Sequence, residues 1–291
     1  MTNAPHLFCF GYGYTAQTLG QRLLKEGWRV SGTTTSEDKA TALKETDVQM
    51  TIWRAEDVLP QDALNGVTHL LQSIVPDDTG DPVLGDLHTH LAHTDTLEWV
   101  GYLSTTGVYG NQDGAWVDES TPVAPSNQRG KRRVLAEEQW LKWGQETRVA
   151  THIFRLSGIY GAYRNALSKV RAGTARRIQI DNHYFSRIHV EDIATVLQAS
   201  IASPHAGSIY NLADDMPSPA ADVTTYACEL LDVTPPPLQT PEEVQLSPMA
   251  MSFYNNSKRV RNDKIKNDLG VSLQFPDYKV GLRQLYEDGA Y

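Results

Sequence analysis

The sequence contains little cysteine, no long apolar run and no excess of positive charge. Only two cysteines, Cys9 and Cys228, occur in 291 residues, which argues against a disulfide and favours the cytoplasm. No apolar run reaches the roughly 18 residues of a membrane-spanning helix, and residues 1–6 are too short and polar for a signal peptide. The net charge of -9 argues against nucleic acid as the main partner. We therefore expect a cytoplasmic protein that binds neither a membrane nor nucleic acid.

Repeats, low-complexity segments and a metal-binding pattern are also missing. His88, His90 and His93 have the spacing i, i+2, i+5, which does not put all three on one helical face. We therefore expect no metal site there. What is present is a hydrophobic fraction of 40%, enough for an ordinary folded core. The length fits one large domain or two small ones.

A glycine-rich motif, G-x-G-x-x-A, lies close to the N-terminus. It follows an apolar run at residues 7–10 and precedes residues with helical spacing. In this setting Gly11 permits a tight turn, Gly13 lets a pyrophosphate approach the backbone, and Ala16 lets the helix pack on the strand. The N-terminus of the helix would hold the phosphates. An ordinary turn with two glycines is the alternative. The residues expected to bind the cofactor here are Gly11, Gly13, Tyr14, Thr15 and Ala16.

The end of the second expected strand, residues 29–32, has no carboxylate. An Asp or Glu there would accept hydrogen bonds from the ribose hydroxyls and favour NAD. The chain has hydroxyls instead, which suit a 2′-phosphate and favour NADP over NAD, although the nearest cation, Lys39, follows a helical turn later. Capping of the next helix is the alternative use of these hydroxyls. The four residues are Thr33, Thr34, Thr35 and Ser36.

Strands and helices alternate along the chain. A strand over 67–74 ends in Ser73, Ile74 and Val75, which we expect to face the cofactor because ligands bind at the carboxyl ends of parallel strands. The pattern predicts an α/β fold with a doubly wound parallel sheet. Further strands are expected at 48–53, 100–103, 150–156 and 209–212, a strand and turn at 178–182, and helices at 39–46, 130–144, 165–172, 186–203, 221–231 and 278–286.

Four segments together resemble the extended short-chain dehydrogenases/reductases, the NAD(P)-dependent epimerases and dehydratases. They are the glycine motif, L-S-T-T-G-V-Y-G at 103–110, F-R-L-S-G-I-Y-G at 154–161 and I-H-V-E-D-I-A at 188–194. The resemblance implies a Rossmann domain over residues 1–155. It implies a smaller substrate-capping region over 156–291, with about 186–203 packing back on the sheet. It also implies a homodimer formed through the helices that flank the fifth and sixth strands.

The hydride chemistry of this family uses a hydroxyl residue, a tyrosine and a lysine. The resemblance places the hydroxyl on Thr105, where it would polarise a carbonyl. The Tyr and Lys positions fall on Arg129 and Arg133, and arginine does not exchange its proton near neutral pH. The chain therefore resembles the atypical members that keep the glycine motif and have no Tyr-x-x-x-Lys pair. Both arginines share one helical face and would line the pocket, with a solvated basic face as the alternative.

Other residues near the expected cleft are candidates for substrate binding or proton transfer. Tyr109 is a candidate for substrate binding, and Arg164 and Arg187 would meet an anionic or phosphorylated substrate. No spacing singles out one residue as the replacement for the missing tyrosine. The candidates for that proton transfer are Tyr109, Tyr160, Tyr163, His189 and water.

Two functions are consistent with these patterns. The first is an NAD(P)-dependent oxidoreductase or epimerase/dehydratase-like enzyme acting on a small polar, nucleotide-sugar-like molecule by hydride transfer. The second is a sensor or regulatory protein that binds NAD(P) without turnover, which the loss of the Tyr-x-x-x-Lys pair favours. A structural protein with an empty glycine turn is a third reading, which the arrangement of residues around a cleft disfavours.

Overall fold

The computed structural model describes residues 4–43, 46–54, 57–244, 254 and 256–291. Parts of two expectations lie outside these residues: the first three residues of the N-terminal segment, and positions 44–45 of the helix expected at 39–46. Among the described residues the main feature is a seven-stranded parallel sheet in the order β11-β7-β5-β4-β1-β2-β3. Its strands are β1 His6–Phe10, β2 Arg29–Thr34, β3 Val48–Ile52, β4 His69–Gln72, β5 Trp99–Thr105, β7 Ala150–Leu156 and β11 Ile209–Leu212.

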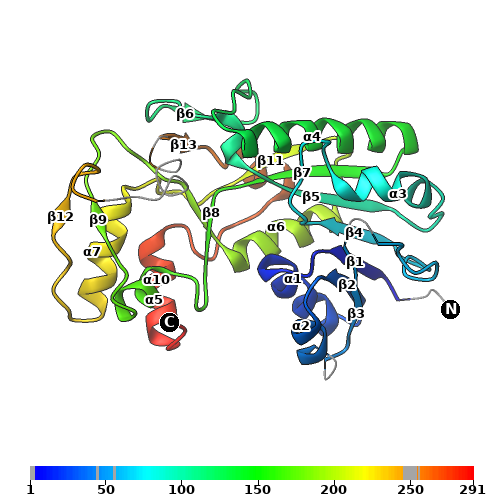
Figure 1. Cartoon of the computed structure of the whole chain (residues 1–291), viewed down its shortest axis with the longest axis horizontal. Helices are drawn as coiled ribbons and strands as arrows, with labels where there is room; N and C mark the ends of the chain where they lie inside the picture. Colours follow the sequence, from blue (N-terminus) through cyan, green and yellow to red (C-terminus); the bar gives the residue numbers. More distant parts are fainter. Residues whose placement is uncertain (1–3, 44–45, 55–56, 245–253, 255) are drawn as a thin grey trace. The chain divides into compact units, whose positions relative to one another are not determined.

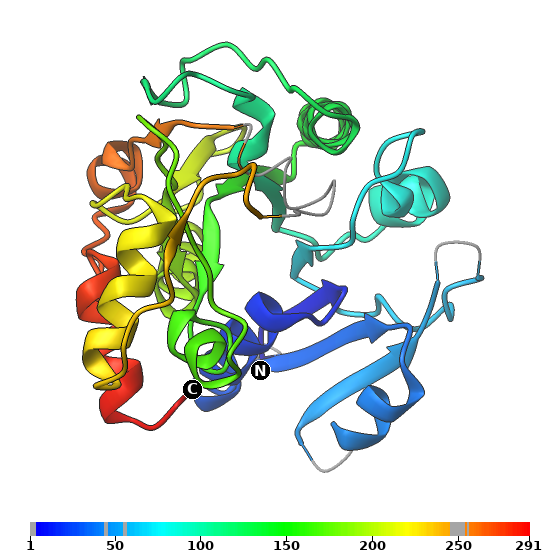
Figure 2. The same cartoon turned by 60° about the vertical axis from the view of Figure 1, so that its left-hand side comes forward.

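Helices cover both faces of this sheet, as Figures 1 and 2 show. The doubly wound α/β fold expected from the alternating pattern is thereby confirmed. One face carries α3 and α4, and the other carries α1 and α6 (Figure 1). No helix in the described part of the chain combines the length and apolarity needed to cross a membrane. The helices are α1 Tyr14–Lys25, α2 Glu37–Ala42, α3 Pro82–Ala92, α4 Gln128–Thr147 and α6 Val190–Ala202.

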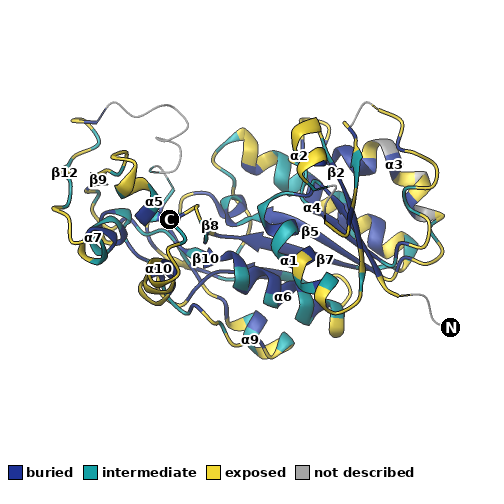
Figure 3. Cartoon of the chain, turned by 90° about the horizontal axis from the view of Figure 1, so that it is seen from below, coloured by how far each residue is buried: buried dark blue, intermediate teal, exposed yellow. Residues whose placement is uncertain are grey.

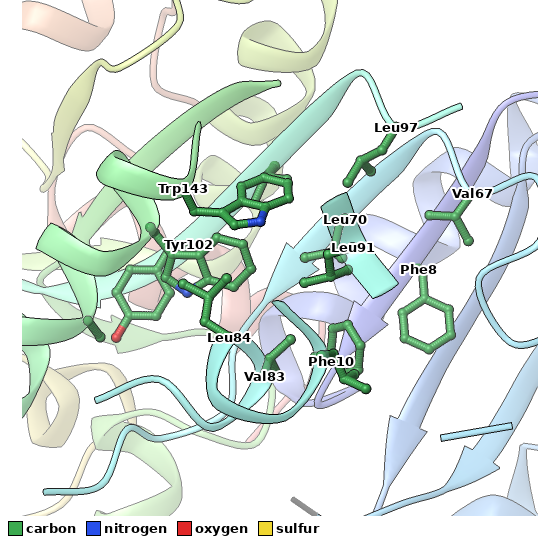
Figure 4. Close-up of a cluster of buried hydrophobic side chains, with 14 of the residues drawn as sticks. Phe8, Phe10, Val67, Leu70, Val83, Leu84, Leu91, Leu97, Tyr102 and Trp143 are labelled. Atoms are coloured by element: carbon green, nitrogen blue, oxygen red, sulfur yellow. The ribbon is translucent and has the colours of Figure 1, made fainter. Parts of the chain in front are cut away.

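The strands are apolar because they are buried between two helical layers. Figure 3 shows them as dark blue ribbons between helices whose outer sides are exposed. Figure 4 shows the core under α3 and α4, where Phe10 of β1 lies beside Val83 of α3, and Phe8 and Leu84 belong to the same cluster. Trp143 of α4 is 1% exposed in the same cluster.

The chain forms two compact units. The first contains Met1–Ser104, Lys131–Arg155 and Ala194–Tyr210, and the second contains Thr105–Gly130, Leu156–Ile193 and Asn211–Tyr291. In the second unit, buried side chains of α5, α7 and α10 form a separate core. Its elements are 3₁₀ helix η1 Thr106–Tyr109, β6 Trp116–Val117, β8 Gly158–Tyr160, α5 Ala166–Arg171, β9 Arg177–Ile178, β10 Arg187–His189, α7 Ala220–Leu230, β12 Leu238–Gln239, β13 Arg259–Val260, α9 Asp263–Leu269 and α10 Tyr278–Glu287.

One expected element of the second unit is wrong. The helix expected from 186 begins only at Val190, because residues 187–189 form β10 and pair in parallel with β8. The strand and turn expected over 178–182 are present as the shorter β9, which pairs with β12, and as a turn at Asn182 with φ 53°. The error in the helix comes from pairing between segments distant in sequence, which local pattern does not reveal.

Three histidines are buried in the first unit and are expected to make the protein acid-sensitive. Burial lowers the pKa of His6, His69 and His152 to about 4, with Arg29 adding to the effect on His6. Between this value and the unfolded pKa of about 6.5, the unfolded chain binds protons that the folded chain does not. Stability is therefore expected to fall as the pH drops through this window. Each histidine contributes roughly 1.4 kcal/mol per pH unit.

The contribution of one histidine is measured by urea unfolding of His69→Phe at several pH values. The Phe ring keeps the aromatic contacts with Trp28 and Trp99 but does not titrate. The variant is expected to show a shallower loss of stability toward acid than the parent. The comparison between variants is needed because burial raises the pKa of Asp214 to about 8, which changes stability in the opposite direction. Parallel curves for parent and variant would contradict the assignment.

Candidate dinucleotide-binding site

The glycine-rich turn is held by the neighbouring strands β2 and β4. Gly11 has φ 79°, and a Cβ there would lie 2.8 Å from Ser73 Oγ. Its N–H donates to Thr33 Oγ1 at 2.9 Å, and its carbonyl accepts from Ser73 Oγ at 2.5 Å. The structure thus brings together three of the predicted cofactor residues, one from each of three adjacent strand ends.

Gly13 leaves open space where a side chain would be. It is the N-cap of α1, with an extended backbone at φ -85° and ψ -165°. A Cβ there would meet only Gly11 O, at 3.9 Å. Behind it, Thr15 and Ala16 are buried at 6% and 1% exposure. The first turn of α1 contains no acidic residue. This is the cradle that a pyrophosphate needs: a helix N-terminus with no side chain in front of it.

Tyr12, between the two glycines, supports the turn. Its side chain is 2% exposed and packs so closely on α1 that a Cβ at Gly20 would lie 2.4 Å from the Tyr12 hydroxyl. Its N–H donates to Thr33 O at 2.8 Å. Sequence reasoning missed this role because it depends on the contact of Tyr12 with Gly20, eight residues further along.

The hydroxyls at the end of β2 have backbone partners. Thr33 is buried and accepts from Gly11 N, and Thr34 Oγ1 accepts from Ser36 N at 3.2 Å. Ser36 Oγ accepts from Lys39 N at 3.2 Å and caps α2. The capping alternative for Ser36 is therefore present in the structure. Thr35, Thr34 and Ser36 lie at the surface or partly exposed.

The end of β4 is ordered by a buried amide. Gln72 donates to both carboxylate oxygens of Asp81, at 2.9 and 2.7 Å, and accepts from Ile74 N at 3.1 Å. Asp81 also receives N–H groups from the first turn of α3. Ser73 points back to the glycine turn, and Val75 is 69% exposed. This loop is thus fixed by hydrogen bonds on both sides of the predicted cofactor residues.

Helix α4 carries the two arginines that are expected at the family's Tyr and Lys positions. Arg133 is half-buried and donates through Nη1 to Leu103 O at 2.6 Å and Tyr102 Oη at 3.1 Å. Arg129 is exposed. Burial raises the pKa of Tyr102 well above its ordinary range, so this hydroxyl stays neutral. The guanidinium of Arg133 is therefore a fixed cation beside the end of β5.

A buried ion pair anchors α4 one turn further on. Arg155 of β7 donates to Glu137 of α4, with Nη2 to Oε2 at 2.7 Å, and their side chains are 5% and 4% exposed. Ser104 Oγ donates to the same carboxylate at 2.5 Å. This contact holds the helix that carries Arg133 against β5 and β7.

The other predicted site residues belong to the second unit, except for Arg133. Thr105 follows Ser104 at the end of β5, is half-buried, and accepts from Gly107 N at 3.1 Å. Tyr109 is fully buried and its hydroxyl donates to Asn211 Oδ1 at 2.8 Å. A substrate role for Tyr109 therefore has no support in this arrangement, and its hydroxyl instead joins η1 to β11. Arg164 is exposed in a tight turn.

Arg187 lies beside an acid that sequence reasoning missed. Its Nη1 donates to Phe185 O at 3.0 Å and Ser218 O at 3.1 Å. Asp214 is 1% exposed, and burial raises its pKa to about 8. Arg187 interacts with Asp214 and also with Asp222, and burial lowers the pKa of its guanidinium. Its guanidinium is a candidate contact for an anionic substrate group.

The sequence of this chain is similar to those of known proteins. A model of the NAD dependent epimerase/dehydratase family matches residues 11–213. Among curated proteins, Protein YeeZ of Escherichia coli (strain K12) is 27% identical over 281 residues, covering 92% of this chain and 95% of that protein.

Solved structures share the fold over nearly the whole chain. A conserved protein of unknown function from Silicibacter pomeroyi DSS is 47% identical, with a TM-score of 0.92, and the match covers 99% of this chain and 100% of that one. The dTDP-glucose 4,6-dehydratase of Bacillus anthracis str. Ames, solved in complex with NAD, is 15% identical with a TM-score of 0.76. That match covers 98% of this chain and 96% of the dehydratase, and at this identity it shows a shared fold alone.

Proposed function

Because the chain belongs to the NAD dependent epimerase/dehydratase family, we propose that it is an NAD(P)-dependent oxidoreductase or epimerase/dehydratase-like enzyme. Its proposed substrate is a small polar, nucleotide-sugar-like molecule. The observation that carries the proposal is the glycine turn. Hydrogen bonds join Gly11 to Thr33 of β2 and to Ser73 after β4. Gly13 has no side chain and so leaves the space before α1 open. The residues present fit a dinucleotide, which the family and the NAD-bound dehydratase also support.

The chain's own residues would divide the binding of the cofactor between them. The turn and the N-terminus of α1 would hold the pyrophosphate, and the end of β2 the adenosine ribose. Arg133, fixed by Leu103 O and Tyr102, would donate to the hydroxyls of the nicotinamide ribose. When bound, the nicotinamide would take or give a hydride. Thr105 would donate to the reacting carbonyl oxygen of the substrate, and Arg187 would contact an anionic group.

The proposed reaction also needs a group that transfers the proton. Arg129 and Arg133 remain protonated and cannot serve as acid and base. Of the four side-chain candidates, Tyr109, Tyr160 and His189 are buried at 0%, 7% and 4% exposure, and Tyr163 is 76% exposed to solvent. We propose that water moves the proton, at a cost in rate of about 10²–10⁴-fold relative to a placed acid/base.

The family likeness also supports a homodimer through α3 and α4.

The proposal is tested by mixing the NAD(P)-loaded protein with dTDP-glucose and recording the absorbance of reduced nicotinamide. Slow reduction of the bound cofactor is expected. Substitution Thr105→Val should slow the reduction about 10²-fold with cofactor affinity unchanged, because the substrate oxygen that becomes the carbonyl oxygen loses its hydrogen-bond donor. The double change Arg129→Tyr with Arg133→Lys should increase the rate by about 10² or more.

The second candidate function, an NAD(P)-binding sensor without turnover, is favoured by the two arginines at the Tyr and Lys positions. It predicts tight cofactor binding with no reduction in either the parent or the double variant. That result would overturn the enzymatic proposal and leave the sensor in its place.

A further inference from the structure

Two cations lie near the carboxyl ends of β2 and β3, and one of them contacts the glycine turn. One is Lys39 of α2 and the other is Arg54, which follows β3. The parallel register pairs Thr34 with Ile52, so these two strand ends are adjacent. The sequence placed only Lys39 in this region, because the position of Arg54 depends on the pairing of β2 with β3.

The ammonium of Lys39 reaches back to the glycine turn. Its Nζ donates to the carbonyl of Tyr12, between Gly11 and Gly13. Within the described chain no carboxylate forms an ion pair with it. An ammonium has three N–H donors, so two remain for a ligand. Burial lowers the pKa of Lys39, and an anion bound at this nitrogen would offset that desolvation.

The guanidinium of Arg54 is attached to the loop after β2. Trp53 N donates to Thr34 O at 3.0 Å, and Arg54 Nη2 lies 3.4 Å from Thr35 O. The side chain is exposed and forms no ion pair with a described residue. The nearby carboxylate of Asp57 accepts from the backbone N–H of Arg54 at 2.9 Å. Most of the guanidinium donors are therefore available for a ligand.

Among the described residues, no carboxylate at this place is positioned as an acceptor for ribose hydroxyls. Thr33 is used by Gly11 N, and Ser36 caps α2. The next acids in the chain, Glu37 and Asp38, are exposed in the first turn of α2. The free 2′-hydroxyl of NAD needs a hydrogen-bond acceptor, and the two cations here provide none. A negatively charged 2′-phosphate would instead accept hydrogen bonds from both cations.

We propose that Lys39 and Arg54 bind the phosphate monoester on the adenosine ribose and make this protein selective for 2′-phosphorylated dinucleotides. The Lys39 ammonium holds the phosphate close to the glycine turn, and the Arg54 guanidinium contacts it from the β3 side. Thr34, Thr35 and Ser36 line the loop between the two cations. This assignment rests on the proposed function, because it specifies the cofactor of the same site.

The test measures fluorescence titrations of the full chain with NADPH and NADH, and with adenosine 2′,5′-bisphosphate and AMP. The variants are Lys39→Met and Arg54→Gln. Matched controls are Lys25→Met, in the last turn of α1, and Arg29→Gln, at the opposite end of β2. Both control side chains are exposed. Each control removes the same charge as its partner variant, so general electrostatic attraction changes equally.

The parent is expected to bind NADPH at least about 10-fold more tightly than NADH. Each site variant should weaken NADPH and the bisphosphate about 10-fold, with NADH and AMP changed less than about 2-fold, and the controls should behave as the parent. Equal loss for both nucleotides, or a parent that prefers NADH, would overturn the assignment while leaving the proposed function standing. Binding of neither nucleotide would overturn both.

Discussion

Substitution Gly13→Val is expected to weaken dinucleotide binding by roughly 100-fold or more, while the protein stays folded. The reason is the unusual freedom around Gly13. A Cβ there meets no protein atom closer than Gly11 O at 3.9 Å, and the backbone angles suit any residue. The branched side chain would instead fill the space before the N-terminus of α1, where a pyrophosphate must approach the main-chain N–H groups.

Fluorescence titration with NADPH and NADH measures the loss, and a thermal melt by circular dichroism checks the fold. Gly85→Val is the control, since a Cβ at Gly85 also meets nothing within 4 Å and the residue lies away from the turn, in α3. Gly11→Val would be a poorer test because its φ of 79° and the contact with Ser73 would strain the fold itself. Undiminished affinity in folded Gly13→Val would show that the cofactor does not use this turn.

The second large effect is expected on stability, at the buried pair of α4 and β7. Glu137→Gln should reduce the free energy of unfolding by about 3–5 kcal/mol. The change leaves Arg155, with a side chain 5% exposed, without its compensating charge. It also weakens the hydrogen bond that Ser104 Oγ donates at 2.5 Å.

Urea unfolding monitored by circular dichroism measures this loss. Glu138→Gln is the matched control, since Glu138 is the next residue and is exposed, and it should change stability by about 0.5 kcal/mol or less. The double variant Glu137→Met with Arg155→Met should recover much of the loss, because both buried charges are then removed. Similar midpoints for Glu137→Gln and Glu138→Gln would mean that the pair contributes little.

Local pattern was enough for much of the central sheet. The strands expected at 150–156 and 209–212 coincide with β7 and β11. These segments are apolar and buried, so their own residues carry the signal. The short strand β10 was predicted as helix because it owes its structure to pairing with β8, a segment 29 positions away in the register Arg187↔Gly158.

The candidate site divides in the same way. The glycine motif is local, so Gly11, Gly13 and Ala16 could be identified from spacing, and the turn they form with α1 is present. The hydroxyls after β2 were recognised, but not that Thr33 is already used by Gly11 N. Tyr109 belongs to a recognisable motif, yet only the packed structure shows its hydroxyl bonded to Asn211 and inaccessible.

By itself, the sequence determined the alternating α/β order and the glycine turn, and it has Arg129 and Arg133 four residues apart on one expected helix. Each of these features depends on residues that are consecutive or closely spaced in the chain. Only the tertiary structure decided which polar groups remain available to a ligand. It placed Arg54 beside Thr35, turned Lys39 toward Tyr12 and buried Asp214 near Arg187. Such outcomes depend on strand pairing and desolvation, which arise between segments distant in the chain and leave no local pattern.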